Sequence, residues 1–377
     1  MISKSKETRE LRPGVYGPLP TFFDDNQEID FVSYKKHLLN LASKGIVPVC
    51  SGSLGEAVHL NYDERKRVIR FIRETLDQGG LTSTPIVAGV GGSSTRETIE
   101  LAHAAATAGA DAGMVILPAY YAASLSADEE QIIQYYVDIC EGSPIPLLLY
   151  NFPANAAGLD MSSAIIEAVM RRTSNLCGVK LTCGGSIGKL IRLTATINEE
   201  PSINGDRQFP FLLLDGLIAD LTPWVSSGGH GTVSGIPNFA PLATMKLWKF
   251  LNNPHLTKDE TEEASRLQAM LSKADVAAVP AGIRGMKYAL HKMHGWRTKR
   301  QSIKELRRQS EDLQKEHFKM RELEARSRAG VWGNANEEGA ARLPSYDAIF
   351  KDTMRGKFGV QTSAQHAEVR HQENTTA

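Results

Sequence analysis

The feature that most constrains the fold of this chain is an alternation of short apolar runs with segments of helical period, which continues from about residue 13 to residue 240. Eight runs predict strands: Val15–Leu19, Ile46–Cys50, Ile86–Val90, Met114–Leu117, Pro146–Tyr150, Gly178–Leu181, Phe211–Leu214 and Gly231–Ser234. Strands that are apolar throughout are typical of parallel sheets, because the crossover helices cover both faces. The alternation therefore predicts an α/β protein with a parallel sheet.

Residues that can cap helices stand between these predicted strands. The side-chain oxygens of Ser, Asn and Asp accept hydrogen bonds from the amides that a helix start leaves unpaired, and a Glu three residues later can complete a capping box. Five helix starts fit this pattern: Asp30, Asn61 with Glu64, Ser94 with Glu97, Ser126 with Glu129, and Asp160. Helices are thus predicted between the strands.

The number of strand–helix units favours a closed barrel over an open sheet. Eight units over roughly 230 residues match a (β/α)8 or TIM barrel, whereas an open doubly wound sheet usually has a glycine-rich phosphate loop after its first strand. The first predicted strand is followed by Pro20 and Thr21, which form no such loop. Gly89–Gly92 is the nearest imitation, but it follows the third strand and lacks the third glycine, so it predicts a βα turn.

The barrel is predicted to occupy residues 13–295 of the 377-residue chain. Further helices that pack on it are predicted between residues 255 and 291, from apolar positions at helical spacing: Leu267, Met270, Leu271, Ile283, Met286 and Leu290. Residues 1–12 are expected to be a flexible N-terminus. Residues 296–328 are expected to form a charged helical arm, with a protein- or RNA-binding arm as the alternative, and the polar residues 329–377 a largely disordered tail.

Composition narrows the class of partner. Lys plus Arg equals Asp plus Glu at 43 each, so no global charge attracts nucleic acid or an acidic membrane, and a small-molecule partner is expected. The cysteines Cys50, Cys140, Cys177 and Cys183 show no metal-binding spacing and are expected to be buried free thiols. No apolar stretch is long enough to span a membrane, and Met1–Arg12 has no apolar core of a secretory signal, so the cytosol is the expected compartment.

Lys180 stands inside the sixth predicted strand among apolar neighbours. Active sites of such barrels lie at the C-terminal ends of the strands. Burial there should lower the pKa of the lysine, because it disfavours the charged form, and a neutral amine can form an imine with a ketone. The alternative is that Lys180 points outward and lies along a helix.

Tyr150 ends the fifth predicted strand. Its hydroxyl, if it faces the same lumen as the lysine, could transfer protons to and from a carbinolamine; the alternative is a packing residue whose hydroxyl bonds to backbone. Ser51–Glu56 follows the second strand, and its small residues leave backbone amides that can bind a carboxylate. Ser53 and Glu56 also have the spacing of a capping box, so a structural role is open.

Five segments together resemble the dihydrodipicolinate synthase/N-acetylneuraminate lyase family of class I, pyruvate-type aldolases. They are Gly52–Glu56, Pro118–Tyr121, Tyr150–Pro153, Gly178–Lys180 and Gly228–Ser234, in the family's order. The resemblance implies a (β/α)8 barrel, usually tetrameric, that uses neither metal nor cofactor. It also implies that Lys180 forms the imine with a 2-oxo acid, that Tyr150 is the proton-transferring acid/base, and that Ser53 links Tyr150 to Tyr121, a tyrosine commonly donated across a subunit interface.

The resemblance further implies how the substrate is bound. The 2-oxo acid carboxylate would lie on the amides of Ser53 and Leu54, with the Val233 backbone nearby. Dihydrodipicolinate synthases carry an arginine for the aspartate semialdehyde carboxylate where this chain has Asn155, and Leu54 replaces the usual hydroxyl residue. These departures favour the branches that act on 4-hydroxy-2-oxoglutarate or 2-keto-3-deoxy sugar acids.

The interpretation that combines these observations is a metal-independent lyase. It would cleave or form a 4-hydroxy-2-oxo acid, giving pyruvate or a related 2-oxo acid and an aldehyde. Two alternatives stay open: a hydro-lyase that uses the same imine on a deoxy sugar acid, and a catalytically silent barrel that acts as an interaction scaffold. The expected partners are the small-molecule substrates and further copies of the chain in a tetramer or dimer, with no nucleic acid and no membrane.

Overall fold

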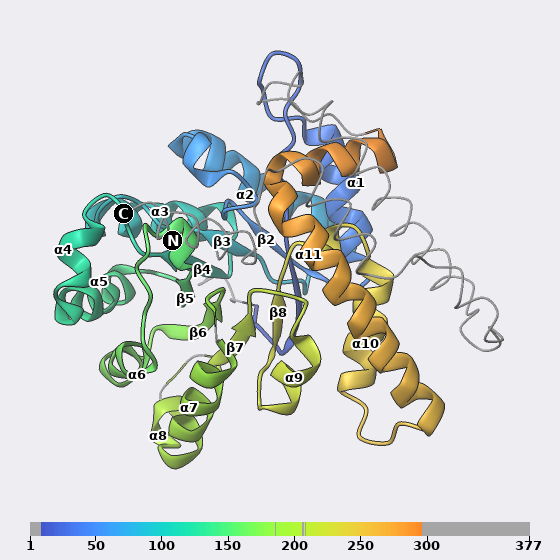
Figure 1. The fold of residues 1–377 in the computed structure, drawn as a ribbon. Coiled ribbons are helices and arrows are strands. Elements are labelled where there is room, and N and C mark those ends of the chain that lie inside the picture. Colours follow the sequence, from blue (N-terminus) through green and yellow to red (C-terminus); the bar gives the residue numbers. More distant parts are fainter. Residues whose placement is uncertain (1–8, 185, 206, 208, 296–377) are drawn as a thin grey trace, which may run out of the picture. The chain divides into compact units, whose positions relative to one another are not determined.

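The computed structural model describes residues 9–295 apart from 185, 206 and 208. Parallel strands form a closed barrel in sequence order (Figure 1). They are β1 (Gly14–Pro18), β2 (Val47–Cys50), β3 (Val87–Gly89), β4 (Ala112–Ile116), β5 (Leu147–Asn151), β6 (Leu176–Leu181), β7 (Leu212–Asp215) and β8 (Gly231–Val233). The (β/α)8 prediction is confirmed, and each strand lies close to its predicted bounds.

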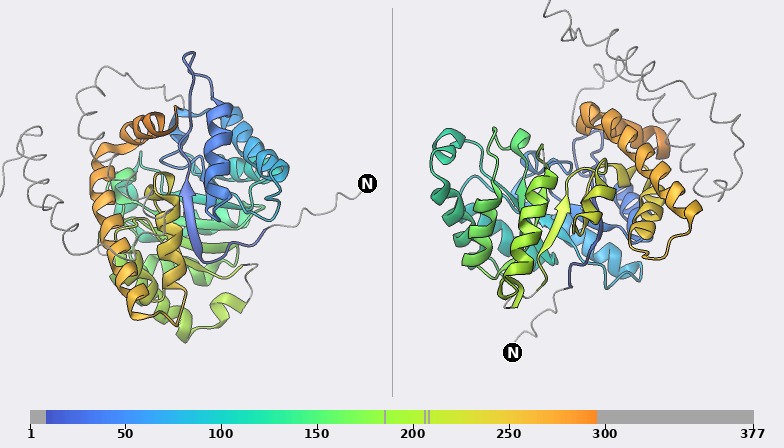
Figure 2. Two further views of the ribbon diagram at one scale, coloured as in Figure 1. Left: turned by 90° about the vertical axis from the view of Figure 1, so that its right-hand side faces the viewer. Right: turned by 60° about the horizontal axis from the view of Figure 1, so that its bottom comes forward.

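Helices follow the strands and surround the barrel (Figures 1 and 2). They are α1 (Phe31–Ala42), α2 (Tyr62–Gln78), α3 (Thr95–Ala108), α4 (Ala122–Ser126), α5 (Glu129–Gly142), α6 (Ser163–Arg172), α7 (Ser186–Glu199), α8 (Ser202–Gly205), α9 (Leu221–Ser226), α10 (Pro241–Leu251) and α11 (Lys258–His294). Short 3-10 turns are η1 (Ala57–His59), η2 (Pro153–Asn155) and η3 (Ile236–Asn238).

Three predicted helix starts are confirmed by the capping geometry. The Asp30 side chain accepts hydrogen bonds from two amides of the first turn of α1, and Asn61 forms a complete capping box with Glu64 at α2. The Ser94 hydroxyl accepts from the Glu97 amide at α3. Amides at the start of these helices therefore have side-chain acceptors.

Two predicted helix starts are wrong by two residues. Ser126 is the last residue of α4, and α5 is capped instead by Asp128, whose carboxylate accepts from an amide of the first turn. Asp160 does not cap α6, because Ser162 does so through its hydroxyl. In both cases two capping residues stand close together, and the direction in which the chain enters the helix decides between them.

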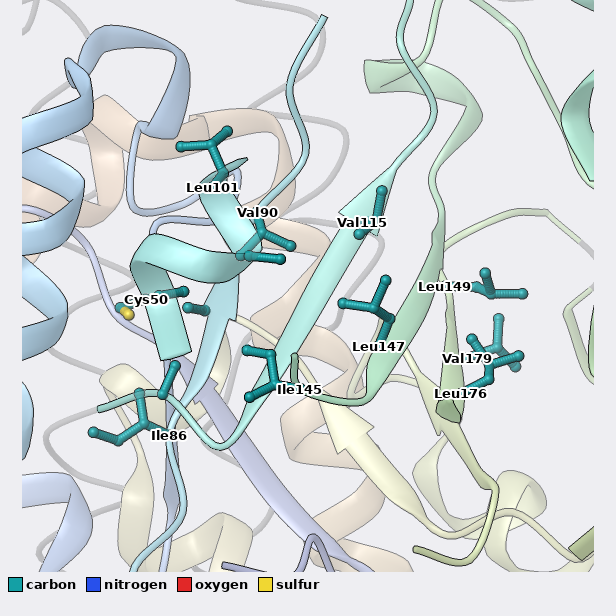
Figure 3. Packing of buried hydrophobic residues seen from close by; sticks show 14 of the residues in the cluster. Cys50, Ile86, Val90, Leu101, Val115, Ile145, Leu147, Leu149, Leu176 and Val179 are labelled. Atoms are coloured by element: carbon teal, nitrogen blue, oxygen red, sulfur yellow. The ribbon is translucent and has the colours of Figure 1, made fainter. Parts of the chain in front are cut away.

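The side chains of each strand alternate between the lumen and the helix layer. One buried cluster fills the lumen with residues from all the strands, among them Tyr16, Val49, Val87, Met114, Leu148, Tyr150, Cys177, Leu214 and Val233. A larger cluster lies between the strands and the helices; Figure 3 shows part of it, with Val115, Leu147 and Val179 on the neighbouring strands β4, β5 and β6. This alternation is what gives a polar residue on a strand a defined direction.

The Gly89–Gly92 segment is a βα turn, as predicted. The Gly92 amide donates to the Thr98 hydroxyl and the Ser93 amide to the Glu97 carboxylate, so side chains of α3 occupy these donors.

The helical pattern predicted between residues 255 and 291 forms α11 alone, and α10, which precedes that range, lies beside α11 (Figure 2). They share an apolar cluster that includes Leu247, Leu267 and Leu271, and the Lys246 ammonium pairs with the Glu263 carboxylate. α11 is interrupted at Gly282 (φ 60°, ψ −162°), two residues after Pro280. The helix therefore bends, and the residues after Gly282 form a separate segment with its own contacts.

Within residues 9–295, no helix has the length and apolar character needed to cross a membrane. The four cysteines are buried and free, as expected. The expectations for the charged arm at 296–328, the tail at 329–377 and residues 1–8 of the predicted flexible N-terminus lie outside the described residues. Residues 9–12 of that N-terminus are described and are held in place, since Leu11 is buried and the Arg9 guanidinium pairs with the Asp111 carboxylate.

Where β8 meets β1 and closes the barrel, the backbone at Gly231 lies very close to the backbone at Gly14. Gly231 has a φ of +131°, and a Cβ built on it would lie 1.9 Å from the Gly14 carbonyl oxygen. We expect Gly231→Ala to lower the free energy of unfolding by about 2 kcal/mol or more, because the added methyl group pushes the two strands apart. The midpoint of thermal unfolding should fall by roughly 4–8 °C.

Gly14→Ala is the matched control, because Gly14 is the register partner of Gly231 and its added Cβ would meet only the Arg12 carbonyl oxygen, at 3.6 Å. Equal melting temperatures for the two variants would contradict the prediction.

Candidate active site

Lys180 and Tyr150 lie side by side inside the barrel. They are register partners on β6 and β5, and the Lys180 Nζ is 4.0 Å from the centroid of the Tyr150 ring. Val179 and Leu181 belong to the outer cluster, so Lys180 between them points into the lumen, where it is 6% exposed. The alternative in which Lys180 lies along an outer helix is therefore wrong.

A glycine two residues before the lysine shapes the strand. Gly178 has a φ of +153°, and a Cβ there would lie 2.4 Å from the Leu212 carbonyl oxygen on β7. The pairing of β5 with β6 shifts register between Leu147 and Leu148, so that Leu148 pairs with Gly178. Glycine thus permits both the close approach of β7 and the register that brings Lys180 to Tyr150.

Tyr150 is fixed by the residues that follow it on the chain. Its ring stacks on Phe152, with ring centroids 5.7 Å apart and an angle of 29° between the planes. The Asn151 side chain accepts a hydrogen bond from the Met161 amide (3.0 Å) and donates one to the Asp160 carboxylate (2.7 Å). Asn151 thus anchors the end of β5 to the loop before α6, a role that the sequence analysis missed although the residue belongs to the quoted motif.

Asp160 pairs with the Lys189 ammonium instead of capping a helix. Lys189 lies on α7 and also donates to the Cys183 sulfur at 3.4 Å. Lys189 is therefore a second buried lysine near the strand ends, but it is held by a carboxylate. For Lys180 no carboxylate partner is found in the described part of the chain.

The loop after β2 presents backbone donors. Ser51 and Glu56 at its two ends have left-handed backbone conformations, with φ of 50° and 54°. The Glu56 amide donates to the Ser53 carbonyl, which closes a turn between them (3.1 Å). The amides of Ser53 and Leu54, by contrast, have no acceptor among residues 9–295. Successive unpaired amides of this kind can bind an anion.

The capping box considered for Ser53 and Glu56 is wrong. Glu56 is buried, and its carboxylate pairs with the Lys287 ammonium on α11 and with His59 Nδ1 (3.2 Å). A residue in the left-handed conformation does not lead into a regular helix, and only the 3-10 turn η1 follows. Sequence gave no signal for the ion pair, since its two residues come from opposite ends of the barrel sequence.

The other predicted site residues lie at different distances from the lumen. Val233 ends β8 and belongs to the lumen cluster. Asn155 is exposed on η2, which follows β5. Tyr121 is 71% exposed, and its ring contacts Tyr120 with centroids 4.9 Å apart. The single chain therefore brings Lys180 and Tyr150 together and leaves Tyr121 projecting outward.

Asp215 is a buried carboxyl group that the sequence analysis missed, although it directly follows an apolar run. It ends β7, is 1% exposed, and accepts a hydrogen bond from the Leu217 amide (3.2 Å). Burial, assisted by the neighbouring carboxylates of Asp220 and Asp275, raises the pKa of Asp215 to about 8. Burial also raises the pKa of Asp275, on α11, to about 6. The Asp215 carboxyl is therefore protonated at neutral pH.

In the part of the chain that the structure describes, no three His, Cys, Asp or Glu side chains come together in a way that could hold a metal ion.

The fold and the lumen define a class of protein: a (β/α)8 barrel with a buried amine at the strand ends, where such barrels carry out their chemistry. A model of the dihydrodipicolinate synthetase family matches residues 12–320. The chain therefore belongs to this family, as the sequence motifs indicated.

Curated relatives narrow the class. A probable mitochondrial 4-hydroxy-2-oxoglutarate aldolase from Emericella nidulans is 37% identical over 289 residues, which cover 76% of this chain and 87% of the relative. An L-threo-3-deoxy-hexylosonate aldolase from Aspergillus niger is 34% identical over 301 residues, which cover 76% and 88%. These names support an aldolase, a carbon–carbon lyase, and favour the main interpretation over the hydro-lyase and the silent scaffold.

Solved structures agree with the fold. A putative dihydrodipicolinate synthase family protein from Coccidioides immitis has a TM-score of 0.63 and 30% identity, with 75% of this chain and 83% of that chain covered. YagE, a prophage protein of the dihydrodipicolinic acid synthase family from Escherichia coli K12 in complex with pyruvate, has a TM-score of 0.62 and 26% identity, with 74% and 87% covered.

The raised pKa of Asp215 predicts a pH dependence of stability. Between about pH 4 and pH 8 the folded protein keeps a proton that the unfolded chain has released, so the free energy of unfolding falls as pH rises, by up to about 1.4 kcal/mol per pH unit. Asp215→Asn removes this proton exchange. Its stability should fall less than that of the wild type between pH 5 and pH 8 in urea unfolding.

Asp63→Asn, at an exposed position on α2, serves as the control and should keep the pH slope of the wild type. A slope that is unchanged in Asp215→Asn would show that this carboxyl is already ionised in the folded state.

Proposed function

We propose that this protein is a class I aldolase in which Lys180 forms an imine with pyruvate or a related 2-oxo acid. The single observation that carries the proposal is the buried Lys180 amine, 4.0 Å from the centroid of the Tyr150 ring in the lumen. Support also comes from the relative that was solved in complex with pyruvate.

The reaction begins when the neutral Lys180 amine attacks the keto carbon and forms a carbinolamine. Tyr150 donates the proton that lets the hydroxyl leave as water, which gives the imine. The positive imine nitrogen then accepts the electron pair of the bond between the third and fourth carbons, while Tyr150 takes the proton of the 4-hydroxyl group, and the aldehyde leaves. Protonation of the enamine and hydrolysis release the 2-oxo acid. Because the imine is the electron sink, no metal is needed.

The carboxylate of the 2-oxo acid is bound by the Ser53 and Leu54 amides in this proposal. Two successive backbone amides supply hydrogen-bond donors of fixed direction. Because the carboxylate is bound without a basic side chain, no such side chain lies beside the enamine to protonate it at an unproductive carbon. In the same proposal the backbone of Val233, the last residue of β8, contributes to this binding position. The apolar Leu54 side chain forms the wall next to the aldehyde.

Tyr121 is assigned to an oligomer. Its exposed ring could enter the site of a neighbouring copy, where the Ser53 hydroxyl would link it to Tyr150. We propose a cytosolic homotetramer. The relative from Emericella nidulans is named mitochondrial, so fractionation of cells that express the full chain distinguishes the two locations.

Reduction with borohydride tests the imine directly. Pyruvate plus borohydride should add one covalent adduct per chain, and peptide mass mapping should place it on Lys180, because an imine reduces to a stable secondary amine. Lys180→Arg should give no adduct and no cleavage of 4-hydroxy-2-oxoglutarate. An adduct on Lys189, the other buried lysine near the strand ends, would overturn the assignment, and an aldehyde product distinguishes the aldolase from the hydro-lyase.

Asn155 should make aspartate semialdehyde a poor acceptor, since an amide cannot form the bidentate charged contact that arginine forms with a carboxylate. Such a contact is worth roughly 1.5–3 kcal/mol, or about one to two decades in rate. Asn155→Arg should therefore raise the condensation of pyruvate with this aldehyde by about tenfold or more. Efficient condensation by the unaltered chain would contradict the prediction.

A further inference from the structure

The segment of α11 after the break at Gly282 contacts the loop that follows β2. The Lys287 ammonium pairs with the Glu56 carboxylate, and both side chains are buried. The Lys287 Nζ also lies 4.5 Å from the centroid of the Phe23 ring. This ion pair joins the end of the chain's described part to the loop that carries Ser53 and Leu54.

A second contact lies beside the ion pair. A Cβ built on Gly235, just after β8, would be 3.0 Å from the Met286 Cε and 3.5 Å from the Leu54 Cδ1. Met286, next to Lys287 on α11, and Leu54 therefore both lie against this glycine, and they belong to the same apolar cluster. The α11 segment thus packs against both loops that border the proposed carboxylate site.

The loop needs such support because its backbone is strained. Ser51 and Glu56 both adopt the left-handed conformation, which is unfavourable for a non-glycine residue and persists only where surrounding contacts impose it. The Thr21 hydroxyl donates a hydrogen bond to the carbonyl of Gly55, directly before Glu56 (2.7 Å). Glu56 is held through its side chain, by Lys287 on one oxygen and His59 on the other.

We propose that Lys287 is a positioning residue for the aldolase: through Glu56 it keeps the Ser53 and Leu54 amides directed at the 2-oxo acid carboxylate. The inference rests on the proposed function. Removal of the ammonium leaves a buried carboxylate without its main partner, and the loop rearranges to bring that carboxylate toward water. Binding of the 2-oxo acid should then weaken, while Lys180 and Tyr150 keep their places on the strands.

The experiment measures imine formation as a function of pyruvate concentration, by borohydride trapping on the full chain, together with kcat for aldol cleavage and the melting temperature. Lys287→Met should raise the half-saturating pyruvate concentration by about tenfold or more, with kcat within about threefold of the wild type. Lys287→Arg, which keeps the charge, should restore most of the binding.

Lys246→Met is the matched control. It removes the ion pair that Lys246 forms with Glu263 between α10 and the first part of α11, away from the loop. It should lower the melting temperature to a similar or smaller extent and leave the half-saturating pyruvate concentration unchanged.

The wild type and the Lys287→Met variant together separate a failure of the proposed function from a failure of the positioning role. If the wild type forms no adduct with pyruvate, the proposed function fails. If the wild type forms the adduct and Lys287→Met shows the same pyruvate dependence, the positioning role is wrong.

If Lys287→Met does not fold, Glu56→Gln combined with Lys287→Met removes both buried charges. This double variant should fold but bind pyruvate weakly. Binding as tight as in the wild type would overturn the inference.

Discussion

The site depends on one constraint, the register between β5 and β6. That register places the buried Lys180 amine against the face of the Tyr150 ring in an apolar lumen. It is possible because Gly178 has no side chain, so the backbone of β7 can approach the backbone of β6 at this position. A shift of one residue would turn Lys180 into the helix layer. The position of Lys180 against Tyr150 therefore depends on a close approach between backbones.

The polar residues around the lumen form two sets, each of which holds a different part of the barrel rim. Asn151 fixes the end of β5 from the side of α6 and α7, through Asp160 and Lys189. Glu56 fixes the loop after β2 from the side of α11, through Lys287. Of the two ion pairs only that of Glu56 with Lys287 is buried on both sides. A buried ion pair contributes little net stability, because desolvation offsets the attraction, so its effect is on the geometry of the loop.

Much of the site could be predicted from the sequence, because the relevant signals are local. Lys180 and Tyr150 stand in apolar runs at strand ends, and the small residues around Ser53 mark a loop with unpaired amides. The helix starts at Ser126 and Asp160 were misplaced because neighbouring residues, Asp128 and Ser162, can cap equally well. Local propensity cannot decide between two caps two residues apart.

The sequence by itself determined the alternation of strands and helices, the closed barrel and the lysine at its centre, since hydrophobic period and residue type act over a few neighbours along the chain. Only the tertiary structure decided that Asp215 is buried near Asp275 of α11, and that Lys287 reaches Glu56. These contacts join residues far apart in the sequence. They form because the barrel closes and α11 bends at Gly282. The order of residues along the chain does not show how close these groups come to one another in the folded protein.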